Sequence, residues 1–431
     1  MPDSPYDSPE LSRGAVLFRM TLFVLFVFIF LVGVKLFGSA INLAGGDFAT
    51  SLVEGFKNPF AGLAIGILAT AIMQSSSATT SLVVTMVGAG QIPLANAVPV
   101  VMGANIGTTI TCMMVAMSHI NDRKTFARVL ACTNVHDIFN ILTVCILFPL
   151  EIITRNIFGA GILEHMATYL TDFVSTGGEG SAASTMLAMN PIDACVTPAN
   201  DFLLHFFQNL PLFAGAWKAL PAIVFALFLI LFSLVRITAN MKILMADKME
   251  DWLNRVLKKH GYLGIVFGAL MTMLVQSSSI TTSLLVPMYA AGVLSAYNAF
   301  PLLIGANIGT TITGLLASTV SNSPAGVTIA LVHTLFNVAG MLMFYPIPFM
   351  RKIPIAISMA FAKLILRNRI WAFAFVGLVF FIIPGLGVFL WSEPQEPKPA
   401  TAVEQVEQDG NSEVHLPQEA GDPGVLDNPG S

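Results

Sequence analysis

The chain has 431 residues, of which 55% are hydrophobic and only 11% are charged, and its mean hydropathy is +0.76. Soluble domains carry about 25% charged residues, so this composition excludes a soluble globular protein and predicts an all-α polytopic membrane protein. The formal net charge of −4 is unevenly distributed, because residues 392–431 contain nine acidic residues and one lysine, and the rest of the chain is net positive.

The chain begins with a short acidic tail, residues 1–13, and then reaches its first apolar run. Val16–Phe37 is long enough for one transmembrane helix, which needs about 20 apolar residues. No small-residue cleavage site follows this run, so we expect no cleaved signal peptide. The next stretch, Asp47–Lys57, is amphipathic and is expected to lie at the membrane interface.

A polar run interrupts the next apolar segment, Pro59–Gly90. The run reads Gln74-Ser75-Ser76-Ser77, and the apolar stretch on each side of it has about 15 residues, too few to cross a bilayer. This pattern predicts a re-entrant helical hairpin with the polar run at its tip. Ile92–Ser118 follows and contains Gly103-Ala104-Asn105-Ile106-Gly107-Thr108-Thr109. The transmembrane helix is expected to be interrupted at Asn105–Thr109, and the glycines of the run would allow the break.

The first half of the chain ends with a basic loop, a span and an acidic loop. Asn121–Arg128 carries three basic residues and precedes the predicted span Val129–Ile153, which contains Asp137 and Asn140. Arg155–Leu210 is predicted to be a long loop with five acidic residues and one arginine.

The second half contains a similar order of segments. They are a span at Ala216–Val235, an amphipathic stretch at Arg236–His260, a hairpin at Tyr262–Gly292, a broken span at Phe300–Val320, a span at Val327–Phe349, a basic stretch at Arg351–Arg369 and a last span at Ile370–Trp391. The second hairpin is interrupted by Gln276-Ser277-Ser278-Ser279.

Three polar runs of the first half recur in the same order in the second half. The runs that begin at Gln74, Gly103 and Val135 recur at Gln276, Gly305 and Val332, with offsets of 202, 202 and 197 residues. These matches predict an internal duplication, with transmembrane repeat 1 at 14–153 and repeat 2 at 212–350. The other parts are the N-terminal tail 1–13, the loop 154–211, the basic loop and terminal span 351–391, and the acidic, disordered tail 392–431.

The distribution of basic residues predicts the orientation of the chain. The basic stretches 121–128, 236–260 and 351–369 are placed in the cytoplasm by the positive-inside rule, and the acidic loop 155–210 is placed outside. When the predicted spans are placed between these loops, the two repeats have opposite orientations in the membrane, and their hairpins enter from opposite sides. Inverted repeats with broken helices near the midplane are typical of secondary transporters, here in the plasma (cell inner) membrane.

The polar runs at the two hairpin tips are candidates for an anion site. Polar side chains inside a bilayer are costly and persist mostly where they are buried or line a cavity. Hydroxyls and unsatisfied N–H groups at helix N-termini attract anions, so two tips that meet from opposite sides are suited to one small oxyanion. No lysine or arginine lies within these hairpins, so co-bound cations are expected to balance the charge of the anion.

The two Gly-Ala-Asn-Ile-Gly-Thr-Thr runs are candidates for cation sites. Asn105 and Asn307, threonine hydroxyls and unwound carbonyls supply hard oxygen ligands suited to sodium. Asp137 is the one carboxylate deep in a predicted span, and its counterpart in repeat 2 is Thr334, so its expected partner is a cation. The four cysteines show no metal-binding spacing, and no cofactor is expected.

A structural role is the alternative for several of these residues. Serine and threonine hydroxyls often hold membrane helices together, but the doubling of both polar runs disfavours that interpretation. His136 and His333 recur beside Phe and Asn in both repeats and are interpreted as structural. The structural alternative for Asp137 is a hydrogen bond from a neighbouring hydroxyl in place of a bound cation.

At these motifs the chain resembles the type II sodium–phosphate cotransporter family. The resemblance covers most of residues 50–345 and rests on the two pairs of polar runs and on the stretch Asn121–Asn140. It implies that phosphate is bound by Ser75, Ser76, Ser77, Ser277, Ser278 and Ser279. Together with the residues above, the expected sodium ligands are Gln74, Gln276, Asn105, Asn307, Thr310, Thr313, Asp137 and Asn140.

The resemblance also implies how charge is moved. In this family the aspartate of the Val-His-Asp run is associated with an additional sodium ion and with electrogenic transport, and Asp137 occupies that position. Ala306 stands where relatives often have serine, which is a departure within one sodium site. A second departure is the single terminal span, where animal members have more. The short outer loop, which lacks sequons and paired cysteines, favours a bacterial member.

The sequence therefore predicts a sodium-coupled symporter that imports inorganic phosphate by alternating access, and not an enzyme. Sulfate or arsenate as the anion, and protons as the coupling ion, stay open as alternatives. An intramembrane hydrolase that uses serine, His136 and Asp137 is disfavoured, because adjacent residues on a helix point about 100° apart. Expected partners are phosphate, sodium and membrane lipid, with no nucleic acid, and a homodimer is left open.

Overall fold

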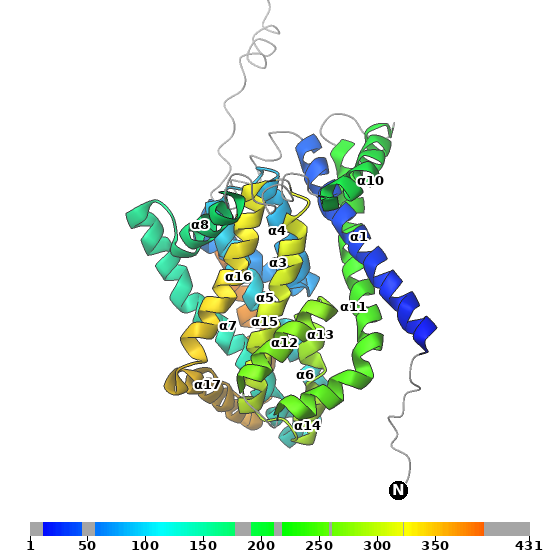
Figure 1. The fold of residues 1–431 in the computed structure, drawn as a ribbon. Helices are drawn as coiled ribbons and strands as arrows, with labels where there is room; N and C mark the ends of the chain where they lie inside the picture. The colour runs from blue at the N-terminus through cyan, green and yellow to red at the C-terminus, as the bar shows by residue number, and fades with distance from the viewer. Residues whose placement is uncertain are drawn as a thin grey trace, which may run out of the picture. The chain divides into compact units, whose positions relative to one another are not determined.

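The computed structural model describes residues 12–44, 57–176, 191–210, 218–257, 261–321 and 323–391. The predicted tails 1–13 and 392–431, the stretch Asp47–Lys57 and the middle of the predicted loop 155–210 lie wholly or largely outside these residues. In chain order the helices (Figure 1) are α1 Arg13–Ala44, α3 Pro59–Met73, α4 Ser76–Gly88, α5 Leu94–Gly107, α6 Ile110–Ala116, η1 Met117–His119, α7 Arg123–Phe158, α8 Ile162–Thr176, α10 Pro191–Gln208, α11 Ala219–Leu257, α12 Gly261–Val275, α13 Ser278–Ser283, α14 Val286–Ala291, α15 Ala296–Ser318, α16 Pro324–Phe344, α17 Pro348–Arg367, α18 Ile370–Gly377, η3 Leu378–Ile382 and α19 Ile383–Trp391.

The described part of the chain contains seven helices that are long and apolar enough to cross a membrane. They are α1, Leu94–His119, α7, the Ala219–Met241 part of α11, α15, α16 and Ile370–Trp391. The regular elements of the described residues are all helical, which confirms the predicted all-α polytopic membrane protein.

The first hairpin follows from the way α3 and α5 lie side by side. Near one end of the pair Gly62 lies against Pro99, and near the other end Gly107 lies against Thr70, so the two helices run in the same direction. A chain that returns to run parallel to α3 must reverse between the two helices, and α4 is the segment that does so. The reversal begins at Gln74, whose φ of 53° is left-handed, so residues 59–90 form a helical hairpin, as predicted.

The second half contains the same arrangement. α12 and α15 run in parallel, with Gly264 against Pro301 and Gly309 against Thr272. Gln276, with a φ of 57°, begins the reversal, and a short turn divides the return arm into α13 and α14. Figure 1 shows the α3–α4 pair and the α12–α13 pair toward opposite ends of the bundle.

Glycines allow the parallel helices to approach closely. A Cβ atom on Gly103 would overlap the carbonyl oxygen of Leu63, and one on Gly305 would overlap that of Ile265. Small residues serve this purpose at many membrane helix contacts. Gly103 and Gly305 are expected from the sequence to allow a break, but both lie inside continuous helical turns and permit the close packing instead.

The segments predicted as loops around α7 are largely helical. α7 begins at Arg123 because Asp122 caps it, with the Thr125 hydroxyl and the N–H groups of Thr125 and Lys124 donating to its carboxylate. These hydrogen bonds, led by that of the Thr125 hydroxyl, hold the pKa of Asp122 below its ordinary value. The predicted loop 155–210 contains the end of α7 together with α8 and α10.

The sequence of α8 has the periodicity of a helix, although its acidic residues led to its prediction as a loop. Leu163, Ala167 and Thr171 are buried at intervals of four residues, which is the periodicity of one helix face. The Thr171 hydroxyl lies 2.9 Å from that of Thr328 on α16, so this face packs against the body of the protein.

α1 and α11 pack along each other on one side of the molecule (Figure 1). The Asn240 amide donates to the Arg19 carbonyl at 2.6 Å, and Arg19 donates back to the Asn240 side chain at 3.3 Å. Lys35, within α1, forms an ion pair with Asp193 of α10 and donates to Thr197 at 2.6 Å. These polar contacts tie α1 to both helices.

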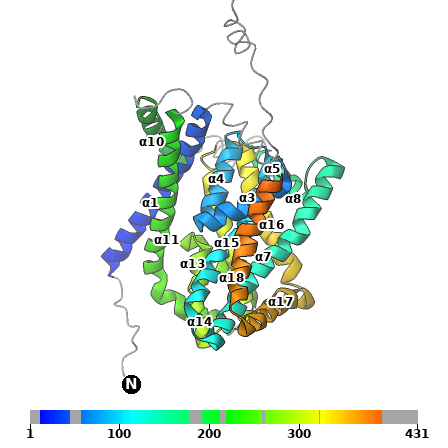
Figure 2. The ribbon, with the colours of Figure 1, turned by 180° about the vertical axis from the view of Figure 1, so that it is seen from behind.

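The terminal span consists of α18, the π-helical turn η3 and α19. Pro384 follows η3 and has no backbone N–H to donate to an earlier carbonyl, which accounts for the widened turn before it. Its end returns to α3, where the rings of Phe60 and Trp391 stack with centroids 5.2 Å apart. Figure 2 shows this span beside α3 and α7.

Candidate functional site at the hairpin tips and the helix crossing

The two Gln-Ser-Ser-Ser runs form the turns of the two hairpins and have the same backbone geometry. Gln74 and Gln276 are the non-glycine residues with positive φ in the described residues. Ser75 and Ser277 follow in an extended conformation and cap the return helices. Each hydroxyl accepts a hydrogen bond from the backbone N–H three residues later, at 3.2 Å and 3.4 Å respectively.

A threonine pair links the two arms of each hairpin. The Thr70 and Thr79 hydroxyls lie 2.9 Å apart, and those of Thr272 and Thr281 lie 3.1 Å apart. The two pairs occupy equivalent positions, with one threonine before and one threonine after each tip. The matching turns and the matching threonine hydrogen bonds therefore give both tips the same local backbone structure.

The other serines of the tips are shielded from solvent. Ser76, Ser77 and Ser278 are buried, and Ser279 is half-buried. In the described residues no hydrogen bond joins these four hydroxyls to another side chain. The structure thus places all six predicted phosphate residues at the two tips, with Ser75 and Ser277 occupied as caps.

The two Gly-Ala-Asn-Ile-Gly-Thr-Thr runs differ in structure. α5 ends at Gly107, and Thr108 and Thr109, whose backbone stays right-handed, separate it from α6. α15 continues through the second copy, so the prediction of a broken helix there is wrong. Glycine permits a break but does not impose one, and close packing against α12 favours the continuous helix. The Thr310 hydroxyl bonds to the carbonyl four residues earlier at 2.9 Å, as in an ordinary helix.

The asparagines of these runs join four buried helices. Asn307 of α15 donates to Oδ1 of Asn140 on α7 at 2.6 Å, and Asn337 of α16 donates to Oδ1 of Asn105 on α5 at 3.1 Å. His136 Nε2 lies 2.5 Å from Asn307 Oδ1, where it is the donor. Asn140 also donates to the Asn105 carbonyl at 2.7 Å. Both asparagine pairs connect a helix of the first half to a helix of the second half.

This network contains three of the predicted sodium ligands. The structure brings Asn105, Asn140 and Asn307 together, and each of their side-chain oxygens accepts one hydrogen bond within the protein. Sequence reasoning missed Asn337 as their partner. The sequence did contain a signal for Asn337, because an asparagine ends both repeated runs, Val135–Asn140 and Val332–Asn337.

A second group of predicted sodium ligands lies beside the second tip. The Thr313 hydroxyl donates to Oε1 of Gln276 at 2.8 Å, and Thr310 is buried one turn earlier on α15. The first tip differs, because Gln74 is exposed and its amide lies 3.5 Å from the sulfur of Met114. Of the two tips, the second therefore holds the enclosed group of uncharged oxygen ligands, which is suited to sodium.

Asp137 is 1% exposed, and neither of its carboxylate oxygens accepts a hydrogen bond from the described residues. The Thr109 hydroxyl lies beside it but is directed to the Ile106 carbonyl, at 3.0 Å. The ion pairs of the described residues involve other carboxylates. A buried carboxylate without a partner is costly, so this position favours binding of a cation.

Further buried polar atoms without partners lie in the same helices. Both ring nitrogens of His333, the Thr80 hydroxyl and both amide atoms of Asn134 make no hydrogen bond with the described residues. Thr80 and His333 both lie close to Gly314, so α4, α15 and α16 share one polar junction. The equivalent junction of the first half holds the Cys112 sulfur 2.6 Å from the Thr282 hydroxyl.

A family model described as the Na+/Pi-cotransporter matches residues 29–164 and 229–381. These ranges contain both hairpins, both asparagine runs and Asp137. The chain belongs to the Na+/Pi-cotransporter family. Membership of this family confirms the resemblance inferred from the paired motifs.

Named relatives extend this result over most of the chain. Sodium-dependent phosphate transport protein 2A of Mus musculus is 31% identical over 442 residues, which cover 88% of this chain and 69% of that protein. The 2A protein of Ovis aries is 32% identical over 435 residues, with 86% and 68% covered. The 2B protein of Homo sapiens is 30% identical over 460 residues, with 86% and 66% covered. No solved structure matches the chain.

Proposed function

We propose that this protein is a sodium-coupled symporter that imports inorganic phosphate across the plasma membrane of the cell. The relatives named as sodium-dependent phosphate transport proteins cover more than four fifths of the chain. The observation that carries the proposal is the pair of hairpin tips with one shared geometry, because it provides two matched sets of hydroxyl donors in an otherwise apolar bundle.

Phosphate is proposed to bind between the tips, at Ser75, Ser76, Ser77, Ser277, Ser278 and Ser279. Phosphate oxygens accept hydrogen bonds from neutral hydroxyl and N–H donors, and the described hairpin arms contain no lysine or arginine to fix the anion permanently. A site of neutral donors releases its anion more readily than a site of paired charges. Such release is required of a carrier.

Sodium is proposed to bind at two places. One is the group formed by Gln276, Thr310 and Thr313, which is supported by the enclosed Thr313–Gln276 contact. The other is Asp137, which is supported by its burial without a partner. We assign Asn105, Asn140 and Asn307 to bracing the helices that carry these ligands, and Gln74 to the turn of the first hairpin.

The two halves are proposed to be inverted repeats that give alternating access. The placement of the hairpins toward opposite ends of the bundle supports this proposal. Basic residues cluster at one end, around the start of α7 and on α17, and the positive-inside rule places that end in the cytoplasm and the segment 155–210 outside. A sodium ion at Asp137 would make the cycle electrogenic.

The hydrolase alternative receives no support from the site. His136 directs Nε2 to Asn307 rather than to a serine, and Asp137 makes no hydrogen bond to it. Another tetrahedral oxyanion remains the second candidate, because hydroxyl donors do not distinguish phosphate from sulfate by charge alone.

The test is uptake of radiolabelled phosphate into proteoliposomes that contain the purified protein. We expect uptake that requires an inward sodium gradient, increases with an inside-negative potential and is not reproduced by a proton gradient. Sulfate and arsenate are measured in the same vesicles. Uptake of sulfate without phosphate, or phosphate uptake driven by protons in the absence of sodium, would contradict the proposal.

A further inference from the structure

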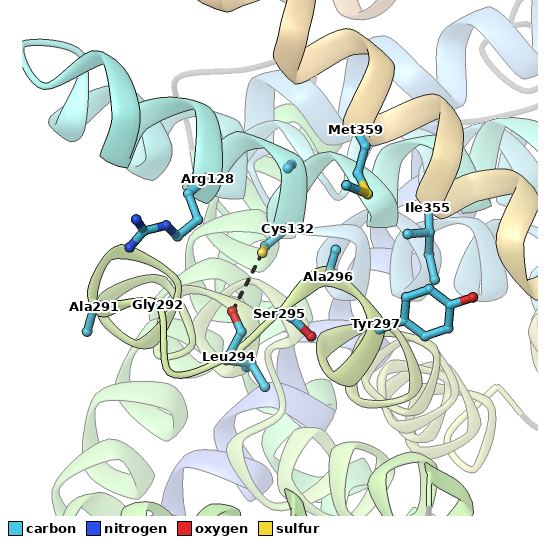
Figure 3. Close-up of a pocket in the computed structure, with 11 residues that line it drawn as sticks. Arg128, Cys132, Ala291, Gly292, Leu294, Ser295, Ala296, Tyr297, Ile355 and Met359 are labelled. Atoms are coloured by element: carbon cyan, nitrogen blue, oxygen red, sulfur yellow. Dashed lines mark hydrogen bonds between the residues drawn. The ribbon is translucent and has the colours of Figure 1, made fainter.

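A cavity of about 670 Å³ lies where α7, the connection from α14 to α15 and α17 meet (Figure 3). It is separate in the sequence from the hairpin tips and from the asparagine network, and none of its lining residues has a role in the transport site described above. Figure 3 shows Arg128 of α7 on one side of the cavity and Tyr297 of α15 on the other, with Met359 of α17 across from Ser295.

The walls of the cavity are apolar. Leu294 and Ile355 are buried there, while Met359 is 48% exposed at its rim. The neighbouring surface is also apolar, since Val293 is 62% exposed and Tyr297 is 47% exposed. Exposed apolar side chains on a membrane protein normally contact lipid, so the mouth of the cavity is suited to an amphiphile rather than to a small soluble ion.

The polar side of the cavity is basic. Arg128 donates from Nη1 to the carbonyl of Ala290 at 3.0 Å, and the guanidinium group has five N–H donors in total. Two segments at this end of the protein, 117–128 and 348–371, contain eight basic residues and one acidic residue, Asp122. Asp122 is engaged by the first turn of α7, and no acidic residue lines the cavity.

The cavity lies near the ends of helices that are long enough to span a membrane. Arg128 lies in the second turn of α7 and Tyr297 in the first turn of α15, so both are at the ends of membrane-spanning helices. Tyrosine and arginine are favoured at the membrane–water interface, where headgroup phosphates lie. Basic pockets between transmembrane helices are known to hold anionic lipid headgroups.

We propose that this cavity is a binding site for an anionic phospholipid. The lipid phosphate lies at Arg128, and the beginning of an acyl chain lies against Leu294, Ile355 and Met359. Free phosphate would use the arginine but not the apolar walls, and a zwitterionic lipid would bring a cationic group into an already basic environment. An anionic phospholipid satisfies both sides of the cavity.

The position of the site gives the lipid a structural effect on the second hairpin. The Arg128 bond to Ala290 ends on the last turn of α14, which is the return arm of that hairpin. Gly292 has a φ of 74° and lies so close that an added Cβ would be 2.8 Å from Arg128 Nη1. A headgroup held at Arg128 therefore stabilises the junction between the second hairpin and α15.

The test measures lipid binding and thermal stability of the full-length protein in a neutral detergent. Phosphatidylglycerol at saturating concentration is expected to raise the melting temperature by about 5 °C, whereas phosphatidylcholine with the same acyl chains is expected to have little effect. Native mass spectrometry is expected to show one retained phosphatidylglycerol. Both effects should be lost in Arg128→Gln and kept in Arg123→Gln, which removes a nearby exposed charge that does not line the cavity.

Three outcomes would overturn the proposal. They are an equal response of both variants to phosphatidylglycerol, an equal response of the native protein to phosphatidylcholine, and the same stabilisation by inorganic phosphate alone. If Arg128→Gln does not fold, Ala296→Trp is the second variant, because the Ala296 side chain points into the cavity (Figure 3) and the substitution keeps the arginine. Retention of phosphatidylglycerol by that variant would also contradict the proposal. Phosphate uptake is not the readout, so these results leave the proposed transport function untouched.

Discussion

Asn307 donates a hydrogen bond to Asn140 at 2.6 Å, and this buried contact joins α15 of the second half to α7 of the first. The Asn337–Asn105 contact, at 3.1 Å, joins the equivalent residues, because Asn105 corresponds to Asn307 and Asn337 corresponds to Asn140 in the other half. The recurring asparagines thus fix how the two halves cross. The orientation of both hairpins depends on this crossing, because α5 and α15 pack against their first arms.

We expect Asn140→Ala and Asn307→Ala each to destabilise the protein, since each leaves buried polar groups without a partner. The expected loss is about 1–3 kcal/mol for each variant, and the two losses should be coupled by about 1 kcal/mol in a double-mutant cycle. Reversible unfolding in mixed micelles measures both quantities. Thr168→Ala, on the exposed face of α8, is the control, and full additivity of the two asparagine variants would argue against the pairing.

Gly103→Ala is expected to disrupt the contact between α3 and α5, because the added Cβ would overlap the carbonyl oxygen of Leu63. Overpacking of this kind costs about 1–3 kcal/mol or more, which should appear as a lower melting temperature in detergent. Gly377→Ala is the matched control, since nothing lies within 4 Å of its added Cβ. There the higher helix propensity of alanine should give an unchanged or slightly higher melting temperature.

Thr313→Val is expected to weaken sodium activation of transport, because it removes the hydroxyl that contacts Gln276. An increase of about tenfold in the sodium concentration for half-maximal uptake corresponds to the loss of about 1.4 kcal/mol. Thr111→Val alters the equivalent position in the first half, where Gln74 is exposed, and should leave sodium activation unchanged. Equal effects of the two substitutions would show that the hydroxyl acts in helix packing alone.

Asp137→Gly is expected to retain sodium-dependent uptake but to lose the transport current. Moving one fewer charge per cycle removes about 2.3 kcal/mol of driving force per 100 mV of membrane potential. Voltage-clamped vesicles measure this directly, and Asp137→Asn should behave in the same way because it removes only the charge. Asp122→Asn, at the exposed cap of α7, is the control. A current that persists in both Asp137 variants would exclude a cation at this carboxylate.

Sequence patterns alone determined the class of the protein and the positions of the two hairpins. Hydropathy reports how a segment partitions between lipid and water, and a polar run between two apolar stretches of about 15 residues leaves few options besides a hairpin. The recurrence of Gln74–Ser77 at Gln276–Ser279 also located the two tips that the structure places at equivalent turns. These features are local, so they can be read from adjacent residues.

Only the tertiary structure decided what the repeated polar residues contact. Gly103 and Gly305 do not interrupt their helices but allow a neighbouring helix to pack closely. Asn105 and Asn307 form hydrogen bonds between the two halves of the chain. The tips also differ, since Gln276 is enclosed by Thr313 whereas Gln74 is exposed. A glycine or an amide has several local uses of similar free energy, and the choice among them is made by which distant helix lies within about 3 Å of it.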